Sequence, residues 1–146
     1  MTPGRSRRED RSVARAIREA GLVRVLLAVG AWLFVACVLI QIFLVGLDLF
    51  AKVDASFHRD FAYIFGWLAP ALVLLSRTRD VSRRTQLLAL VLLLLFAIQT
   101  ILPSLRQQVP VFGGLHTVHA LAIFGVAVTL ARRASMEVRG SPPAAT

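Results

Sequence analysis

Four apolar runs follow one another along the chain, and each is bounded by polar or charged residues. They cover about residues 25–47, 57–75, 86–102 and 111–131. At about 1.5 Å per residue, the 23 residues of the first run give about 34 Å of helix, which crosses the hydrocarbon core with some tilt. The pattern predicts an all-α fold. We expect an integral membrane four-helix bundle over residues 25–131, between an N-terminal segment (1–24) and a tail (132–146).

Composition supports a membrane protein and narrows its chemistry. The apolar fraction is 57% and the mean hydropathy is +0.71, which is too high for a soluble domain of this size. The single cysteine, Cys37, lies within the first run, so intrachain disulfides and multi-cysteine zinc sites are excluded; we interpret it as a small buried hydrophobe. The sequence contains no nucleophile arrangement, glycine-rich phosphate loop or paired intramembrane carboxylates, and we assign no catalytic residue.

The basic residues indicate the topology. Fourteen of the 17 lie in the N-terminal segment, the loop between the second and third runs, and the tail. The other two loops hold Lys52, Arg59 and Arg106. By the positive-inside rule, both termini are predicted to be cytoplasmic, in a multi-pass protein of the cell membrane. Because the arginines flank apolar runs, the net charge of +9 indicates topology and not nucleic-acid binding.

Some local features carry expectations of their own. The first dozen residues are predicted to be disordered. Residues 12–21 could form a short amphipathic helix on the membrane surface, but a simple topology signal is favoured. Pro70 is expected to kink the second span, and Pro103 to end the third. Trp67 is placed where it could either line a site or anchor at an interface.

An internal repeat is visible in the polar residues of the runs. Gln41 precedes His58 by 17 residues, and Gln99 precedes His116 by the same 17. The two copies are offset by 58 residues, and both glutamines follow an isoleucine. Such layouts are typical of membrane-protein repeats. We predict two helix pairs related by a pseudo-twofold axis along the membrane normal.

The repeat predicts which histidines meet. His58 lies 19 residues from Arg77, whereas His116 and His119 lie 16 and 13 residues from Arg132. In helices, these separations place His116 within about 4.5 Å of the depth of His58, and His119 about 9 Å away. His58 and His116 are therefore the predicted pair.

A layer of polar groups inside hydrocarbon should face the bundle interior and indicates a functional site. Two imidazoles that face each other across a four-helix bundle suit the axial positions of a haem iron, and we expect haem b with His58 and His116 as ligands. His119 could replace His116 or bond a propionate, and Arg59 could pair with a propionate. Gln41 and Gln99 could hold the imidazole rings of the ligands in place, or they could only form hydrogen bonds between helices.

These features resemble one half of haem A synthase, an eight-span enzyme built from two four-helix halves. The resemblance covers about residues 25–131 and rests on Gln41 with Gly46, His58-Arg59, Ile98-Gln99, and His116 with the apolar stretch after it. It implies histidine ligands at the starts of the second and fourth helices. The chain is also similar to a family of small four-span bacterial membrane proteins of unknown function, which share its length, a Gln-x4-Gly in the first span and a Leu-His near the start of the fourth.

Departures from haem A synthase limit what is carried over. Ala55 stands where that family has a glutamate, the loop cysteine pairs are absent, and only one haem-site equivalent is present. Hydroxylation chemistry is therefore not expected. We expect an electron-transfer or haem-handling role, with a membrane redox partner or a second copy of the chain as partners. The alternatives are a cofactor-free accessory subunit, whose polar layer serves helix packing, and a small-solute or quinone-linked component of a complex. A copper site at the histidines is a further alternative, but no cluster of methionines or thiolates in the sequence supports it.

Overall fold

The computed structural model describes residues 3–105, 109 and 111–140, with side chains from residue 19 onward. The described chain is helical and contains no strand. Its helices are α1 (Pro3–Ala51), α2 (Ser56–Gly66), α3 (Leu68–Ser76), α4 (Arg83–Leu105) and α5 (Val111–Arg139). With α2 and α3 counted as one broken span, four spans are long and apolar enough to cross a membrane. The predicted all-α four-helix membrane bundle is confirmed.

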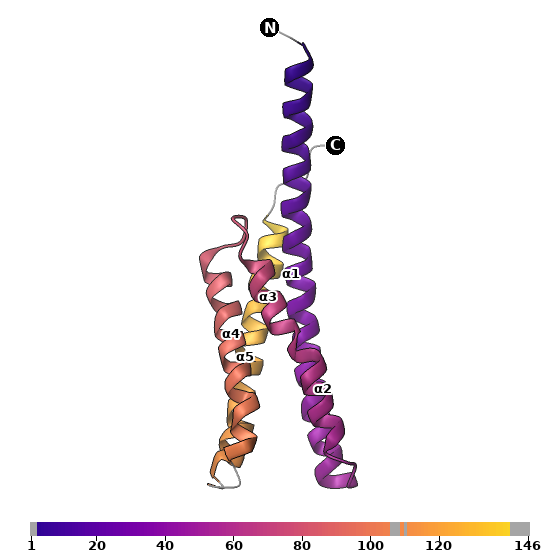
Figure 1. The fold of residues 1–146 in the computed structure, drawn as a ribbon, viewed down its shortest axis with the longest axis vertical. Coiled ribbons are helices and arrows are strands. Elements are labelled where there is room, and N and C mark those ends of the chain that lie inside the picture. Colours follow the sequence, from indigo (N-terminus) through magenta and orange to yellow (C-terminus); the bar gives the residue numbers. More distant parts are fainter. Residues whose placement is uncertain (1–2, 106–108, 110, 141–146) are drawn as a thin grey trace.

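The spans form a ring in which each contacts its two neighbours (Figure 1). α1 packs against α5 on one side and against α2 and α3 on the other, and α4 packs against α3 and α5. Neither diagonal pair, α1 with α4 or α2 with α5, forms a substantial interface. A pseudo-twofold axis along the bundle requires this arrangement, because it exchanges α1 with α4 and the α2–α3 span with α5.

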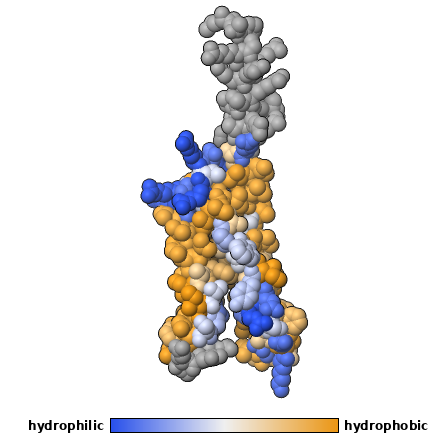
Figure 2. All heavy atoms as spheres, in the orientation of Figure 1, coloured by the Kyte–Doolittle hydropathy of each residue, from blue (hydrophilic) through white to orange (hydrophobic). Residues whose placement is uncertain are grey.

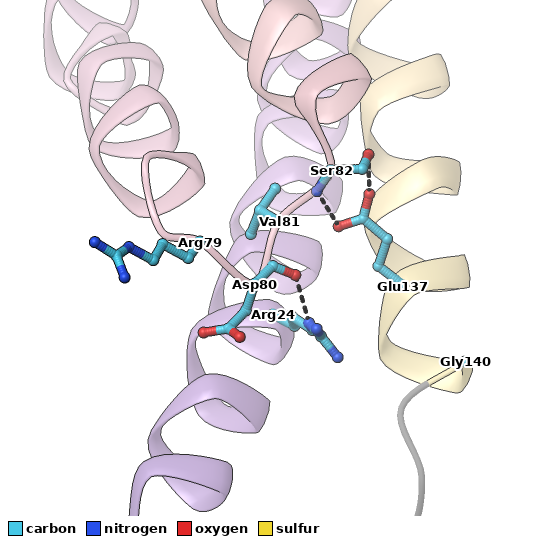
Figure 3. Close-up of a pocket in the computed structure, with 7 residues that line it drawn as sticks. All are labelled: Arg24, Arg79, Asp80, Val81, Ser82, Glu137 and Gly140. Atoms are coloured by element: carbon cyan, nitrogen blue, oxygen red, sulfur yellow. Dashed lines mark hydrogen bonds between the residues drawn. The ribbon is translucent and has the colours of Figure 1, made fainter.

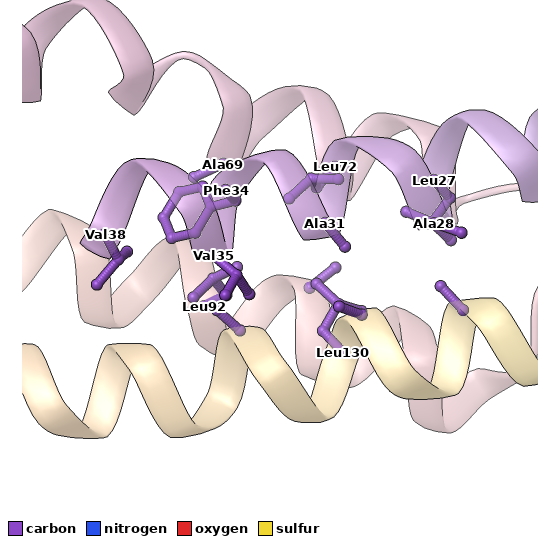
Figure 4. Packing of buried hydrophobic residues seen from close by; sticks show 14 of the residues in the cluster. Leu27, Ala28, Ala31, Phe34, Val35, Val38, Ala69, Leu72, Leu92 and Leu130 are labelled. Atoms are coloured by element: carbon purple, nitrogen blue, oxygen red, sulfur yellow. The ribbon is translucent and has the colours of Figure 1, made fainter. Parts of the chain in front are cut away.

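The interior of the bundle is a narrow apolar core (Figure 4). Its largest fully buried apolar side chains are Leu27, Phe34, Leu72, Leu92 and Leu130. Alanines fill much of the remainder and let the helices approach closely: Ala31, Ala69, Ala89, Ala127, Ala131 and Ala134. Many other large apolar side chains point outward, and they form a hydrophobic belt over most of the face shown in Figure 2. The belt is what a lipid-facing surface requires.

Pro70 explains the break between α2 and α3, as expected. Proline lacks the N–H that would bond the carbonyl four residues earlier, and its ring crowds that carbonyl. The residue four before Pro70 is Gly66, where α2 ends. Gly66 also lies against Phe96 of α4, since a Cβ at this glycine would be 2.7 Å from Phe96 Cε1. Trp67, at the break, is 78% exposed, so it faces outward and does not line a site.

Two local predictions were wrong, and the last helix is longer than the apolar run that predicts it. α1 is one helix from Pro3 to Ala51, so the N-terminal segment described here is neither disordered nor a separate surface helix. The segment is rich in the helix formers alanine, arginine and glutamate, and a single glycine within it does not end a helix. Its first turns extend beyond the other helices (Figure 1). α4 continues past Pro103 to Leu105, because a proline removes only one bond in the last turn. α5 continues to Arg139, so much of the tail is helical.

Candidate cofactor site

The predicted polar residues gather at the end of the bundle that lies opposite the N-terminus of α1. There the pair α1–α2 separates from the pair α4–α5, and Figure 2 shows a hollow between them that is lined by hydrophilic residues. Gln41 lies on α1, His58 in the first turns of α2, and Gln99 near the end of α4. His116 and His119 lie in the early turns of α5. The two halves of the repeat therefore face each other across this hollow.

His58 and His116 are close neighbours across the hollow. Their ring centroids are 6.4 Å apart and the ring planes are 74° to each other. Two imidazoles on opposite sides of one metal, each with a nitrogen about 2 Å from it, would have centroids about 6 Å apart. The spacing of the two rings thus fits a shared metal ion without a change in the helix positions. The predicted pairing of these two histidines agrees with this geometry.

Asp54 supports the position of His58. The Ser56 N–H donates to Asp54 Oδ1 at 2.8 Å, which satisfies a free backbone donor where α2 begins. This backbone hydrogen bond, with a further one from the Ser56 side chain, lowers the pKa of Asp54. The His58 ring then turns toward α1, and its Nδ1 lies 3.4 Å from the Gln41 carbonyl oxygen. With Nδ1 protonated toward that carbonyl, Nε2 is left as the metal-binding nitrogen.

Gln99 connects both histidines of α5. Its Oε1 accepts a hydrogen bond from His119 Nδ1 at 2.8 Å. Its Nε2 donates to the His116 carbonyl oxygen at 3.1 Å and lies 3.3 Å from His116 Nε2. One carboxamide therefore fixes two side chains and ties α4 to α5.

Gln41 differs from its repeat partner. Its side chain is 9% exposed, and its Oε1 is buried without a hydrogen-bond partner among the described residues. The repeat explains the difference, because 58 residues before His119 the sequence has Phe61. A phenyl ring cannot donate the bond that His119 gives to Gln99.

Aromatic side chains lie deeper in the bundle than the polar layer. Phe65 contacts Phe34, Phe61 and Phe96, each with ring centroids 5.3 Å away, and Phe34 is 5.8 Å from Phe96. Phe61 and Phe65 follow His58 by one and two helical turns, so the cluster forms the floor of the hollow. The floor separates the polar layer from the rest of the apolar core.

Arg59 does not join the other predicted residues. It is exposed, and its Nε donates to Asp60 Oδ1 at 3.1 Å. The described residues also contain no group of three or more His, Cys, Asp or Glu side chains that could hold a metal ion. Two facing imidazoles alone suit a metal that brings its other ligands with it, as the iron of a porphyrin does.

A second polar cluster lies at the opposite end and was missed from the sequence (Figure 3). Glu137 Oε1 accepts from Ser82 Oγ at 2.5 Å and from the buried Thr85 Oγ1 at 2.6 Å, so that α5 caps the start of α4. Arg24 Nε donates to the Asp80 carbonyl oxygen at 2.9 Å. An open hollow of about 410 Å³ adjoins these groups. These bonds clamp the start of α4 to α5 and tie α1 to the loop that precedes α4. The available signal was Ser82, a residue type favoured at the N-cap, shortly before the apolar run.

No match to the chain was found among protein-family models, curated proteins or solved structures. The resemblance to haem A synthase therefore stays a prediction.

Proposed function

We propose that this protein binds haem b through His58 and His116 and serves in electron transfer or haem handling in a cell membrane. The observation that carries the proposal is the separation of 6.4 Å between two imidazoles that face each other from diagonally opposite helices. Both rings belong to a layer of partly buried amides and imidazoles, which is costly in a membrane-spanning bundle unless it serves a purpose.

The surroundings of the two rings support a planar cofactor. α1 and α4, the other diagonal pair, form no substantial interface, and the pairs α1–α2 and α4–α5 separate at the end that carries the histidines (Figure 1). The phenylalanine floor supplies apolar contacts, and His58 has its second nitrogen directed at a backbone carbonyl. Bound there, haem would supply one-electron chemistry. Gln41, Gln99 and His119 would hold the rings or the cofactor edge, and Arg59 would leave Asp60 to pair with a propionate at the mouth.

The proposal includes an orientation. With 14 basic residues on one side and three on the other, both termini are cytoplasmic and the histidine layer lies toward the outer face. The redox partner would then reach the haem from the outer side of the membrane or from the bilayer. A second copy of the chain is a further candidate partner.

Haem retention in single variants tests this function. His58→Ala and His116→Ala should each abolish the sharp reduced α-band of the purified protein, whereas His119→Ala should keep it. Thr117→Ala is the matched control, because Thr117 is exposed and lies between the two histidines of α5. Loss in His119→Ala together with retention in His116→Ala would reverse the ligand assignment. Unchanged spectra in all three histidine variants would refute the haem site.

One observation favours the cofactor-free alternative. The Gln99 carboxamide already bonds both histidines of α5, which is how a polar layer that serves only helix packing would look. In that case the purified protein would have no haem absorption after expression with ample haem. Gln99→Leu would still destabilise the bundle, because His119 would lose its acceptor.

A further inference from the structure

The Gln99 carboxamide lies against a nitrogen that a metal ion would need. Its Nε2 is 3.3 Å from His116 Nε2. An amide nitrogen donates hydrogen bonds and has no lone pair to accept one, so His116 Nε2 must be the acceptor. A neutral His116 then carries its proton on Nδ1, and the lone pair of Nε2 points at Gln99.

The orientation of this carboxamide is fixed at both ends. Its nitrogen also faces the His116 carbonyl oxygen at 3.1 Å, which can only accept. Its oxygen lies 2.8 Å from His119 Nδ1, which donates. Rotating the amide by half a turn would set its oxygen against the carbonyl oxygen, so the hydrogen-bond network assigns the nitrogen and oxygen without ambiguity.

The first half of the repeat lacks this arrangement. His58 directs Nδ1 toward a backbone carbonyl, and Phe61 replaces the histidine that would fix the Gln41 amide. The Gln41 oxygen has no hydrogen-bond partner among the described residues. Nε2 of His58 on α2 is therefore available to a metal ion, whereas Nε2 of His116 on α5 accepts a hydrogen bond from Gln99.

We infer that the Gln99 carboxamide occupies His116 Nε2 with a hydrogen bond in the cofactor-free protein and releases this nitrogen when the iron binds. We call this hydrogen bond the latch. This inference rests on the proposed haem function and adds how the site is kept before loading. Release requires the loss of only one contact. The amide can keep its bonds to the His116 carbonyl and to His119 while the His116 ring turns away. The latch keeps His116 in one tautomer and makes haem compete with a hydrogen bond.

Two measurements test the latch. The first is the tautomer of His116 in the haem-free protein in detergent, read from ¹⁵N chemical shifts of labelled histidine. We expect an unprotonated Nε2 that becomes protonated or mixed in Gln99→Met. A protonated Nε2 in the unaltered chain would overturn the inference, whether or not haem binds.

The second measurement is haem affinity. Removing a competing hydrogen bond should tighten binding by about 3- to 10-fold in Gln99→Met and Gln99→Leu. Thr100→Val is the control, because Thr100 is exposed and bonds only the Ala97 carbonyl of its own helix. Weaker binding in both Gln99 variants would mean that Gln99 supports a ligand through His119, which overturns the latch and leaves the haem proposal intact. Absence of haem binding in every protein, the unaltered chain included, would refute the proposed function, and the tautomer alone would then decide on the hydrogen bond.

Discussion

Gly66→Ala is the substitution whose cost follows most directly from the packing. A Cβ at this position would lie 2.7 Å from Phe96 Cε1 and 3.0 Å from Cζ, well inside van der Waals contact. The Phe96 ring cannot easily withdraw, because Phe34 and Phe65 lie against it with centroids 5.8 and 5.3 Å away. The added methyl group therefore strains the aromatic floor directly below the histidine layer.

The magnitude combines two opposing effects. Overpacking a filled core costs about 1–3 kcal/mol, whereas replacing a helical glycine by alanine contributes about 0.5–1 kcal/mol of stability. We expect Gly66→Ala to lower the free energy of unfolding by about 1–2 kcal/mol. At Gly125 an added Cβ meets no atom within 4 Å, so Gly125→Ala should be neutral or stabilising by up to about 1 kcal/mol.

The assay is reversible unfolding in mixed detergent micelles, with a double-mutant cycle. Phe96→Leu makes room at the contact, so Gly66→Ala should cost clearly less in that background than alone. The reasoning is refuted if Gly66→Ala is as stable as the unaltered chain, or if its cost is the same with and without the Phe96 ring.

Three further predictions concern the two ends of the bundle. Glu137→Ala removes the acceptor of the buried Thr85 hydroxyl and should lower the free energy of unfolding by about 1–3 kcal/mol, measured by the same assay. Glu137→Gln should lower it by less. Equal stability of all three proteins would refute the clamp. Asp54→Ala should loosen the first turn of α2, seen as faster amide exchange at Ser56. In the unaltered chain the pKa of Asp54 is lowered, so its hydrogen bond from the Ser56 N–H is present above about pH 4 and is lost as pH falls through that lowered pKa; a protection factor of the Ser56 amide, corrected for the intrinsic pH dependence of exchange, that stays constant over this range would contradict this. Cysteines at positions 56 and 135 should label from opposite sides of the membrane, and labelling of both from one side would refute the topology.

The sequence was sufficient to predict the fold and the meeting of His58 with His116. Both predictions rest on a strong constraint: apolar runs of this length form spans, and polar groups inside them face the bundle interior. The internal repeat then placed His58 and His116 at similar depths in the membrane. Pro70 was equally informative, because the missing N–H acts locally and does not depend on distant neighbours.

Features that depend on distant side chains could not be predicted. Gln99 reaches both histidines of α5 only because its rotamer and the spacing of the helices allow it. Glu137 lies beyond Arg132 and Arg133, which end the apolar run of the fourth span, so the apolar pattern does not reach it, although α5 continues for about two further turns. The exposure of Trp67 depends on which face of the second span meets its neighbours, and the sequence alone left two positions open for this side chain.

The ligands of the iron are the most direct test of the central claim. The measurement is the low-temperature electron paramagnetic resonance spectrum of the purified ferric protein. Ligation by His58 and His116 predicts the low-spin signal of a ferric haem iron with two imidazole ligands. The signal should convert to high spin or vanish in His58→Ala and in His116→Ala. A high-spin spectrum from the unaltered chain, a low-spin signal that survives both substitutions, or no haem signal at all would contradict the proposed site.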